Sequence, residues 1–281
     1  MENRVSRRVA LATAAEIPDG DEDFPALIAA LAGLGVVAEP AVWDGDLDWA
    51  GFDLVVLRST WDYAERRDAF LAWAGSLPRV LNSLPVLEWN TDKQRYLTDL
   101  AAAGVPVVPT GFVAPGEALH APAGPFVVKP AISAGGRSSA RFEAGEDEAA
   151  RSLVARIHAD GRTAMVQPYL GDVEETDLVF IDGAYSHALH RRVPLPAAGD
   201  REVFYLDEEL RPAQAGEQER AVAEAALATV PGELLYGRVD LVDGVVLELE
   251  VAEPSLYLAF GPGAAERFAR AIVGCLGSGS L

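Results

Sequence analysis

Three acidic residues lie close together near the carboxyl end of the sequence, in a segment otherwise rich in valine and leucine. They are Asp240, Glu248 and Glu250, and the last two share one face of a strand because they are two positions apart. Carboxylates this close repel each other unless a cation lies between them. Mg²⁺ takes such hard oxygen ligands, with substrate phosphates completing its shell. The segment predicts a magnesium site, with a solvated acidic strand face as the alternative.

The turn inside this segment decides whether the three carboxylates can meet. A two-residue turn at Asp243-Gly244 would pair Asp240 with Leu247 and place Asp240 and Glu248 on opposite faces. A loop with an odd number of residues, such as a three-residue loop with a glycine bulge, would return them to one face. We therefore predict an odd loop, and a tight two-residue turn would argue against a site of three carboxylates.

The chain contains two lysines, Lys93 and Lys129, among its 23 basic residues. Lysine presents a compact point charge on a flexible stem, whereas arginine presents a wide planar fork. Lys93 lies at a predicted helix start, and Lys129 ends the apolar strand of sequence PFVVKP. We expect both ammonium groups to converge on the phosphates of one nucleotide.

A glycine- and serine-rich segment follows Lys129 directly. Its Ser133, Gly135 and Gly136 offer backbone N–H groups and a hydroxyl without bulk, which suits a loop that closes over phosphates. An ordinary loop explains the composition equally well. The segment fits neither the P-loop nor the dinucleotide-binding glycine pattern.

The overall charge limits the classes of partner. Acidic residues exceed basic ones by 43 to 23, a net charge of −20, so the surface repels nucleic acid and anionic membranes. The first residues are too weakly apolar for a signal peptide, and no apolar run approaches the roughly 20 residues of a membrane span. We expect a cytoplasmic protein without a nucleic-acid or membrane partner, and leave a monomer and a homodimer open.

Alternating strand and helix patterns predict an α/β chain. In residues 1–86, expected as an N-terminal α/β domain that binds substrate, strands are predicted at 8–12, 36–43, 52–59 and 80–82, with helices at 24–34 and 66–74. The strand at 52–59 is apolar enough to be buried on both faces.

Two further units are expected along the chain. Residues 87–168 contain a predicted helix from Thr91 to Ala103, capped by Thr91 and ended by Gly104, then strands at 107–113, 126–129 and 163–170 and a helix at 146–159. Residues 169–281 contain a hairpin that turns at 182–183, a helix at 217–229, the acidic hairpin and a helix from 264.

The order of these motifs resembles the ATP-grasp ligases, in the branch of glutathione synthetase and the ribosomal-protein glutamate ligases. Asn-Thr-Asp-Lys93 and Val-Val-Lys129-Pro resemble the two nucleotide-binding lysine motifs of that family. The resemblance implies an N-terminal open α/β domain, a small lid subdomain and a C-terminal antiparallel-sheet subdomain. ATP would lie between the lid and the C-terminal subdomain.

The same resemblance assigns further ligands. Gln167, Pro168, Tyr169 and Leu170 resemble the hinge that reads adenine through backbone groups, and Glu175 falls at the ribose acid, with Glu174 as the alternative. Glu248-Leu-Glu250, ending at Pro254, resembles the magnesium motif with Asp240 as the upstream acid. Glu250 stands where the family usually has asparagine. The implied cofactors are ATP and two Mg²⁺ ions.

The family's reaction would proceed through an acyl phosphate. A substrate carboxylate attacks the γ-phosphate of ATP, and a nucleophile, usually an amine, then displaces phosphate. Arginine suits the binding of the carboxylate and the acyl phosphate, and the candidates are Arg191, Arg192 and Arg238. Because Arg191 and Arg192 alternate on a strand, one of them faces the site, and we favour Arg192.

Substrate recognition is expected after the buried third strand, at the carboxyl edge where open parallel sheets bind ligands. Arg58, Ser59, Thr60 and Tyr63 lie there, although core packing also explains the aromatic residues. With His187 and the sequence EPSLY, this segment resembles a subgroup that includes the D-cycloserine-forming ligase, which closes an amino-acid-derived substrate on itself.

The resulting expectation is an ADP-forming ligase that acts on a small amino-acid-like carboxylate and makes an amide-type bond. Ring closure within one substrate is the first possibility, and joining of two amino acids or peptides in secondary metabolism is the second. A nucleotide-binding regulator without catalysis is the alternative outside enzymes, although the lysines and metal acids argue against it.

Overall fold

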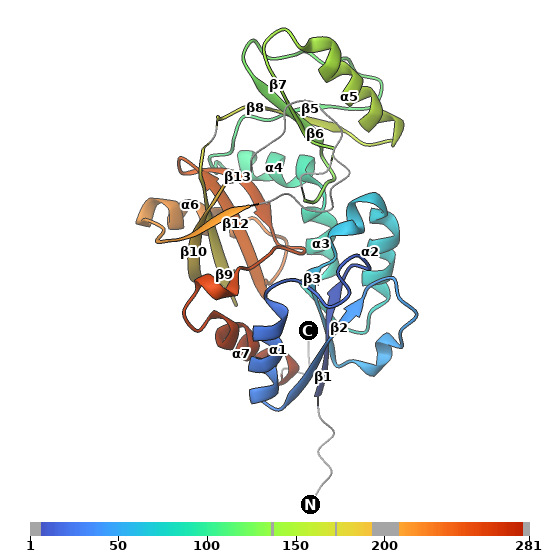
Figure 1. The fold of residues 1–281 in the computed structure, drawn as a ribbon, viewed down its shortest axis with the longest axis vertical. Helices are drawn as coiled ribbons and strands as arrows, with labels where there is room; N and C mark the ends of the chain where they lie inside the picture. Colours follow the sequence, from blue (N-terminus) through green and yellow to red (C-terminus); the bar gives the residue numbers. More distant parts are fainter. Residues whose placement is uncertain (1–6, 136–137, 172, 193–207, 278–281) are drawn as a thin grey trace, which may run out of the picture.

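The computed structural model describes residues 7–135, 138–171, 173–192 and 208–277, which form three β-sheets with helices around them (Figure 1). A parallel sheet and a small antiparallel sheet lie at opposite ends of the molecule, with a five-stranded sheet between them (Figure 1). This arrangement brings strands from distant parts of the sequence toward one central region.

The N-terminal sheet has the strand order β2-β1-β3-β4 and is parallel throughout. Its elements are β1 (Arg7–Thr13), α1 (Phe24–Gly33), β2 (Val36–Val42), β3 (Leu54–Ser59), α2 (Arg67–Ser76) and β4 (Val80–Leu81). Every residue of β3 is buried, as expected for an apolar strand inside a covered parallel sheet. The predicted open α/β architecture of this region is therefore confirmed.

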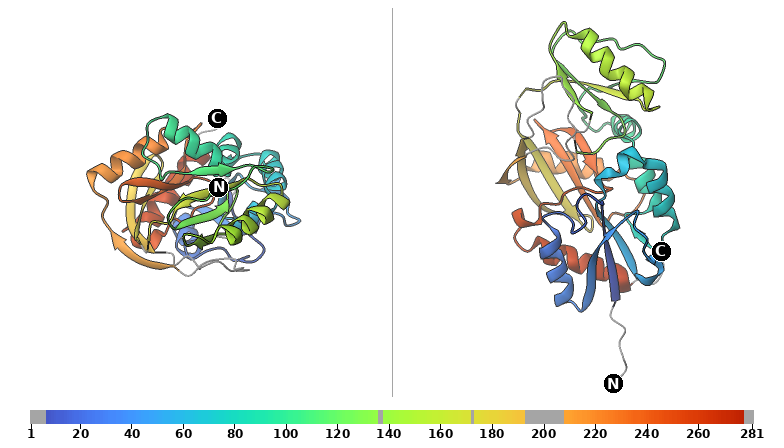
Figure 2. Two further views of the ribbon diagram at one scale, coloured as in Figure 1. Left: turned by 90° about the horizontal axis from the view of Figure 1, so that it is seen from above. Right: turned by 45° about the vertical axis from the view of Figure 1, so that its right-hand side comes forward.

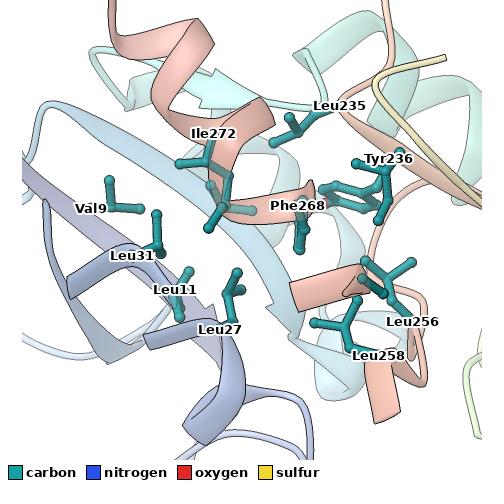
Figure 3. Close-up of a cluster of buried hydrophobic side chains, with 14 of the residues drawn as sticks. Val9, Leu11, Leu27, Leu31, Leu235, Tyr236, Leu256, Leu258, Phe268 and Ile272 are labelled. Atoms are coloured by element: carbon teal, nitrogen blue, oxygen red, sulfur yellow. The ribbon is translucent and has the colours of Figure 1, made fainter. Parts of the chain in front are cut away.

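The last helix of the described chain, α7 (Ala264–Gly277), packs beside α1 on the N-terminal sheet (Figure 2). Figure 3 shows how side chains of α1, α7 and β1 fill one core, together with residues that flank the central sheet. Burying one such aliphatic or aromatic side chain contributes about 1.5–3 kcal/mol. The core beneath the first sheet is thus completed by the carboxyl-terminal helix.

Two helices connect the N-terminal sheet to the rest: α3 (Leu84–Asn90), which the sequence analysis did not predict, and α4 (Lys93–Ala102). Asp92, not Thr91 as predicted, caps α4, because its carboxylate accepts hydrogen bonds from the backbone N–H groups of Gln94 and Arg95. The hydroxyl of Thr91 instead donates to the carbonyl of Leu87 in α3. This cap fixes Lys93 in the first turn of α4.

The small sheet at the far end has the antiparallel order β5-β8-β6-β7 and carries one helix. Its elements are β5 (Gly111–Val113), β6 (Phe126–Pro130), β7 (Ala140–Phe142), α5 (Asp147–Ala159) and β8 (Ala164–Pro168). Its buried residues form a separate hydrophobic cluster, so this unit packs around a core of its own. The strand predicted over 107–113 is shorter than expected, since Val107 forms only an isolated bridge to Val246.

The central sheet is antiparallel, with the order β11-β10-β9-β12-β13. Its strands are β9 (Glu175–Ile181), β10 (Ala184–Arg192), β11 (Glu209–Ala213), β12 (Tyr236–Val242) and β13 (Val245–Glu250), and α6 (Glu217–Leu227) contacts β12 and β13. The predicted turn at Asp182-Gly183 is confirmed, with both residues at positive φ. Within the described ranges, no helix is long and apolar enough to cross a membrane.

The predicted odd loop between β12 and β13 is wrong. Val242 pairs with Val245, and the two turn residues Asp243 and Gly244 have φ angles of 50° and 75°, as in a tight two-residue hairpin turn. A bulge one step inside the hairpin nevertheless shifts the register, so that Asp240 pairs with Glu248. The bulge, and not the turn, therefore brings the carboxylates of Asp240 and Glu248 to one face of the sheet.

Candidate active site

A cavity of about 370 Å³ lies where the small sheet, the central sheet and the N-terminal region meet. Its walls contain residues from all of the predicted ATP and metal motifs: Lys93, Lys129, Ser133, Gly135, Gln167, Pro168, Tyr169, Leu170, Glu175, Glu248 and Glu250. Gly136, which was also predicted to bind ATP, lies outside the described residues. The fold therefore gathers one predicted nucleotide site from β6, β8, α4 and the central sheet.

The two lysines converge on a single carboxylate. The Nζ atom of Lys129, at the end of β6, lies 2.5 Å from Oε1 of Glu248, and the Nζ atom of Lys93 lies 3.7 Å from Oε2. The backbone N–H of Lys93 donates to the carbonyl of Ala131, which ties the start of α4 to the end of β6. The expected convergence of the lysines is found in the geometry, and their binding of phosphates stays a prediction.

The shared ion pair sets the protonation of Glu248 and Lys93. Burial raises the pKa of Glu248, but the ammonium groups of Lys129 and Lys93 lower it by more, so the carboxylate stays ionised. Burial lowers the pKa of Lys93, but Glu248 and, after it, Tyr96, Tyr63 and Glu250 together raise it by more, so the ammonium group stays charged. This region of the cavity therefore holds fixed charges of both signs, as a bound phosphate and a metal ion would require.

The register of the central sheet aligns further charges on the same face. Asp240 of β12 pairs with Asp177 of β9 on one side and Glu248 of β13 on the other, while Arg238 pairs with Glu250. Cross-strand partners point to the same face of a sheet. This face of the sheet consequently carries a group of carboxylates, those of Asp177, Asp240, Glu248 and Glu250, next to the guanidinium group of Arg238. We call these carboxylates the acidic block.

The carboxylates of Asp240, Glu248 and Glu250 meet the basic requirement of a metal site. Each offers an oxygen, and these oxygens lie within 4.8 Å of one another. Burial, outweighing the effect of Arg238, and then the Asp240 and Glu248 charges raise the pKa of Glu250 to about 7. A hard cation beside Glu250 would relieve this repulsion, so the donor set fits Mg²⁺. Glu248 and Glu250 line the cavity, while Asp240 is fully buried behind them.

Arg191, not the favoured Arg192, faces the acidic block. Its guanidinium nitrogens lie 2.5 Å from an oxygen of Asp177, 2.7 Å from Glu175 and 2.6 Å from Asp240. Neighbouring residues on a strand point to opposite faces, so Arg192 lies at the rim, where it is half-exposed and 3.8 Å from Glu209. Arg238 is buried as well and holds both oxygens of Asp240.

Asp177 is the acidic residue that the sequence analysis missed. It is fully buried, and burial raises its pKa well above the ordinary value although Arg191 opposes the shift. The signal was present, because Asp177 lies two positions after Glu175 and therefore shares its face of β9. Of the two ribose candidates, Glu175 lines the cavity, whereas Glu174 is ion-paired with Arg211 near the surface.

The predicted adenine hinge forms one wall of the cavity. The side chain of Gln167 is buried and donates to the hydroxyl of Thr110, which fixes the end of β8. The backbone N–H of Tyr169 donates to the carbonyl of Pro125, and its ring stacks on Arg141. Both contacts hold the end of the strand in place. Recognition of an adenine base by this wall stays a prediction.

The predicted substrate residues divide into two groups. Tyr63 lines the cavity, as does the adjacent Trp61. Arg58, Ser59, Thr60 and His187 are not among the lining residues, and the structure does not support a contact between them and a ligand in this cavity. Arg58 is fully enclosed, 3.6 Å from Asp21 and 3.5 Å from Asp23.

These residues are enclosed by contacts with other elements, among them the segment that follows β13. Asp23 accepts hydrogen bonds from the backbone N–H groups of Leu256 and Leu258, and His187 bonds to the carbonyl of Leu256. The hydroxyl of Ser59 pairs with that of Thr13. The N-terminal sheet thus supports the cavity wall, and its chain first reaches the cavity at Trp61.

Asp21 should make folding stability depend on pH. Burial raises its pKa from 3.8 to about 6, although Arg58 opposes the shift. The folded protein therefore holds this proton more tightly than the unfolded chain, and the resulting stabilisation is full below pH 4 and lost as the pH rises through 6. Relative to Asp21→Asn, wild type should lose on the order of 3 kcal/mol of unfolding free energy between pH 4 and 7. Urea unfolding of both proteins across this range measures it, and parallel pH profiles would contradict it.

Lys129→Arg keeps the charge but should impair the use of ATP. A planar fork cannot occupy the place of a point charge 2.5 Å from Glu248 and beside Lys93 without displacing both. We expect kcat/KM for ATP to fall roughly 10- to 100-fold, the range of one or two charge-assisted hydrogen bonds. Arg151→Lys, a matched swap at an exposed position of α5, should change nothing. Equal kinetics of the two variants would disprove a special role for lysine.

Known proteins resemble this chain over most of its length. Residues 9–82 match the family model of the N-terminal domain of D-cycloserine synthetase DcsG. The cycloserine biosynthesis protein DcsG of Streptomyces lavendulae is 42% identical, over 90% of this chain and 93% of that protein.

Solved structures give the same result. The crystal structure of D-cycloserine synthetase DcsG superposes with a TM-score of 0.83 at 39% identity, covering 96% of this chain and 99% of that one. A structure of the ATP-grasp ligase PsnB, in complex with Mg, ADP and a variant of its minimal precursor, has a TM-score of 0.62 at 17% identity, over 96% and 99% of the chains. The second likeness concerns the fold alone.

Proposed function

The chain belongs to the DcsG family of ATP-grasp ligases, and we propose that it closes the ring of D-cycloserine or a near analogue from one open-chain amino acid. As a member of this family it is an ATP-dependent ligase that joins a carboxylate to a nitrogen. The further proposal concerns the substrate and the intramolecular bond. It is supported by the 42% identity to the DcsG protein over nearly the full length of both chains.

The observation that carries the nucleotide site is the convergence of Lys93 and Lys129 beside the carboxylates of one cavity. We assign the two ammonium groups to the α- and β-phosphates of ATP, Glu175 to the ribose, and residues 167–170 to the base. The cavity lies between residues 87–168, the proposed lid, and the sheet of residues 169–281. Residues 1–86 form the proposed substrate domain.

ATP-grasp ligases use ATP with Mg²⁺, and we propose two ions, held by Glu248 and Glu250 with Asp240 behind them. The ions would neutralise charge on the phosphate oxygens as the phosphoryl group transfers. Glu250 supplies a second carboxylate where the family usually has an amide, which adds a negative charge to the donor set. That charge favours tight binding of a divalent cation.

The reaction that this site supports has two steps. The substrate carboxylate oxygen attacks the γ-phosphorus, the bond to the β-phosphate oxygen breaks, and ADP leaves. The side-chain nitrogen of the same substrate then attacks the acyl carbon, phosphate leaves, and the nitrogen loses a proton. We assign Arg191 and Arg238, buried beside the carboxylates, to the orientation of the acyl phosphate through the groups that they hold.

A product assay tests this proposal. The enzyme is supplied with ATP, Mg²⁺ and, one at a time, D-serine derivatives whose side-chain oxygen carries a nitrogen. We expect one ADP and one phosphate for each D-cycloserine formed, with no second organic substrate required. Mass spectrometry identifies the ring, and a coupled assay measures phosphate.

The alternative functions give different results in the same assay. Phosphate release that requires an added amine, together with a linear amide product, would identify an intermolecular ligase and overturn ring closure. Nucleotide binding without phosphate release from any substrate of the set would favour the regulator. A matched assay of L-serine derivatives tests the stereochemistry, and we expect those derivatives to remain unreacted.

A further inference from the structure

Glu253 is an acidic residue of the cavity that the proposed nucleotide and metal sites leave unused. It is buried, with 8% of its surface exposed, and it lines the cavity. It lies three positions after Glu250 and just beyond the end of β13. Two groups of acids in the described residues have oxygens close enough to share a metal ion, and Glu253 belongs to neither: Asp240, Glu248 and Glu250, and Glu175, Asp177 and Asp240.

The other acids of the cavity wall are each paired with a cation from the protein. Glu175 and Glu208 lie 2.7 Å and 3.5 Å from Arg191, and Glu248 lies 2.5 Å from Lys129. Glu250 lies 3.0 Å from Arg238. For the Glu253 carboxylate, by contrast, no ion pair or hydrogen bond to any residue in the described ranges is found. A buried carboxylate without a partner is costly, so a ligand cation would have a favourable site there.

The pKa of the Glu253 carboxyl group is raised. Burial and then the neighbouring Glu250 charge raise its pKa to about 8, although Lys93 and Arg238 oppose the shift. The group therefore retains a proton in this environment unless another cation replaces it. A positively charged ligand group would take the place of that proton.

The surroundings of Glu253 favour an ammonium group over a metal ion. Trp61 and Tyr63 line the same cavity, and the indole N–H of Trp61 donates to the backbone carbonyl of Glu253 at 3.0 Å. Burial and then the Glu253 charge raise the pKa of the Tyr63 hydroxyl, which lines the same cavity. Aromatic faces attract ammonium groups, whereas Mg²⁺ needs a shell of oxygen ligands.

The backbone that carries Glu253 is held rigidly from both sides. The side-chain oxygen of Asn90 accepts hydrogen bonds from the N–H groups of Val251 and Ala252, at 2.8 Å and 3.1 Å. The hydroxyl of Tyr236 donates to the carbonyl of Ala252 at 2.8 Å. Because this backbone is already ordered, it loses little freedom when the Glu253 side chain binds a ligand, which favours affinity.

We propose that Glu253, together with the aromatic rings of Trp61 and Tyr63, binds the ammonium group of the amino-acid substrate. The inference rests on the proposed function, because an amino acid whose carboxylate is consumed keeps its ammonium group as the charged handle. The substrate would lie with its carboxylate toward the lysines and its ammonium toward the N-terminal domain. Amino acids would thereby be selected over simple carboxylic acids.

The experiment compares Glu253→Gln with wild type on two substrates, the ring-closing amino acid and its analogue with hydrogen in place of the ammonium group. We expect kcat/KM of the variant to fall roughly 30- to 100-fold for the amino acid, as for loss of a buried charge pair, and to stay unchanged for the analogue. KM for ATP should stay within about twofold in both proteins. Glu253→Asp, which keeps the charge, should recover part of the loss.

Glu208→Gln is the matched control, because Glu208 lines the same cavity but already pairs with Arg191 and Tyr257. It should affect both substrates by the same factor. Equal losses for both substrates in Glu253→Gln, or a changed Mg²⁺ requirement, would overturn the proposal, as would unchanged kinetics. Wild type that turns over neither compound would refute the proposed function instead. Should Glu253→Gln fail to fold, Tyr63→Leu gives the same test. This variant is expected to lower kcat/KM for the amino acid and to leave kcat/KM for the analogue unchanged.

Discussion

Glu248→Gln should abolish turnover while leaving a protein that still binds ATP. The substitution keeps the shape of the side chain but removes the charge that Lys129 and Lys93 share at 2.5 Å and 3.7 Å. It also removes a hard anionic ligand from the proposed magnesium site. We expect kcat to fall by roughly 10³-fold, the effect of losing one strong electrostatic contact to a transferring group. Both lysines stay available to phosphate, so the affinity for ATP measured without Mg²⁺ should persist or increase.

The matched control is Glu209→Gln, an identical chemical change in the same sheet. Glu209 belongs to β11, its side chain is 76% exposed, and its ion pair with Arg192 is long, at 3.8 Å. An exposed pair of this kind contributes about 0–1 kcal/mol, so this variant should retain normal kinetics. Steady-state phosphate release and calorimetric ATP binding measure both variants. Normal turnover of Glu248→Gln would show that the catalytic centre lies elsewhere.

Arg191→Met should destabilise the protein far more than Arg192→Met. Arg191 is the shared cation of Asp177 and Asp240, which are both fully buried, so its loss leaves uncompensated charge in the interior. Removing one partner of such a network costs about 3–5 kcal/mol. The melting temperature should therefore fall by roughly 6–20 °C.

Arg192 provides the internal comparison because it follows Arg191 on the same strand and differs in its orientation. Its half-exposed side chain contacts Glu209 only at 3.8 Å, so its replacement should change the unfolding free energy by less than about 0.5 kcal/mol. Scanning calorimetry and urea unfolding of the two variants measure the difference. Similar melting temperatures would mean that solvent or protonation already neutralises the acidic block.

The fold was largely predictable because strong local signals agreed along the chain. The apolar β3 strand, the glycine that ends α4 and the Asp182-Gly183 turn each behave as their residue types require. The resemblance to ATP-grasp ligases, which predicted the arrangement of the sheets, is confirmed by the likeness to solved members. The boundaries at residues 86 and 168 stay predictions, and the packing of α7 on α1 gave no signal in the local pattern.

The candidate site was predictable to the extent that it depends on residue type and order. Both lysines, the hinge and the paired glutamates line the cavity, as the motifs indicated. The preference for Arg192 stays a prediction: both arginines line the cavity, but Arg191 is the one that contacts the buried acids, and alternation alone does not show which neighbour faces them. Arg58, Ser59 and Thr60 were predicted to bind substrate because they follow a parallel strand, and they are not among the residues that line the cavity. The long-range contacts that bury them, to Asp23 and Thr13, have no signature near them in the sequence.

The bulge in the acidic hairpin shows a different limit. Turn chemistry predicts the residues of a tight turn well, and Asp243-Gly244 is a typical example. A bulge within the strand depends on what its residues pack against, and Val246 pairs with Leu241 while accommodating a bridge to Val107 of the neighbouring unit. The joint position of the carboxylates is therefore a tertiary property of this sheet.

The packing of α7 against α1 also has a consequence during synthesis of the protein. Leu27 and Leu31 of α1 share one buried cluster with Phe268 and Ile272, which the ribosome adds more than 230 residues later (Figure 3). At translation rates of about 5–20 residues per second, the apolar face of α1 remains uncovered for roughly 10–50 s. Residues 9–82, which match the N-terminal family model, are thus synthesised long before α7 is available to cover them. We expect chaperones that bind nascent chains to contact this helix during that interval.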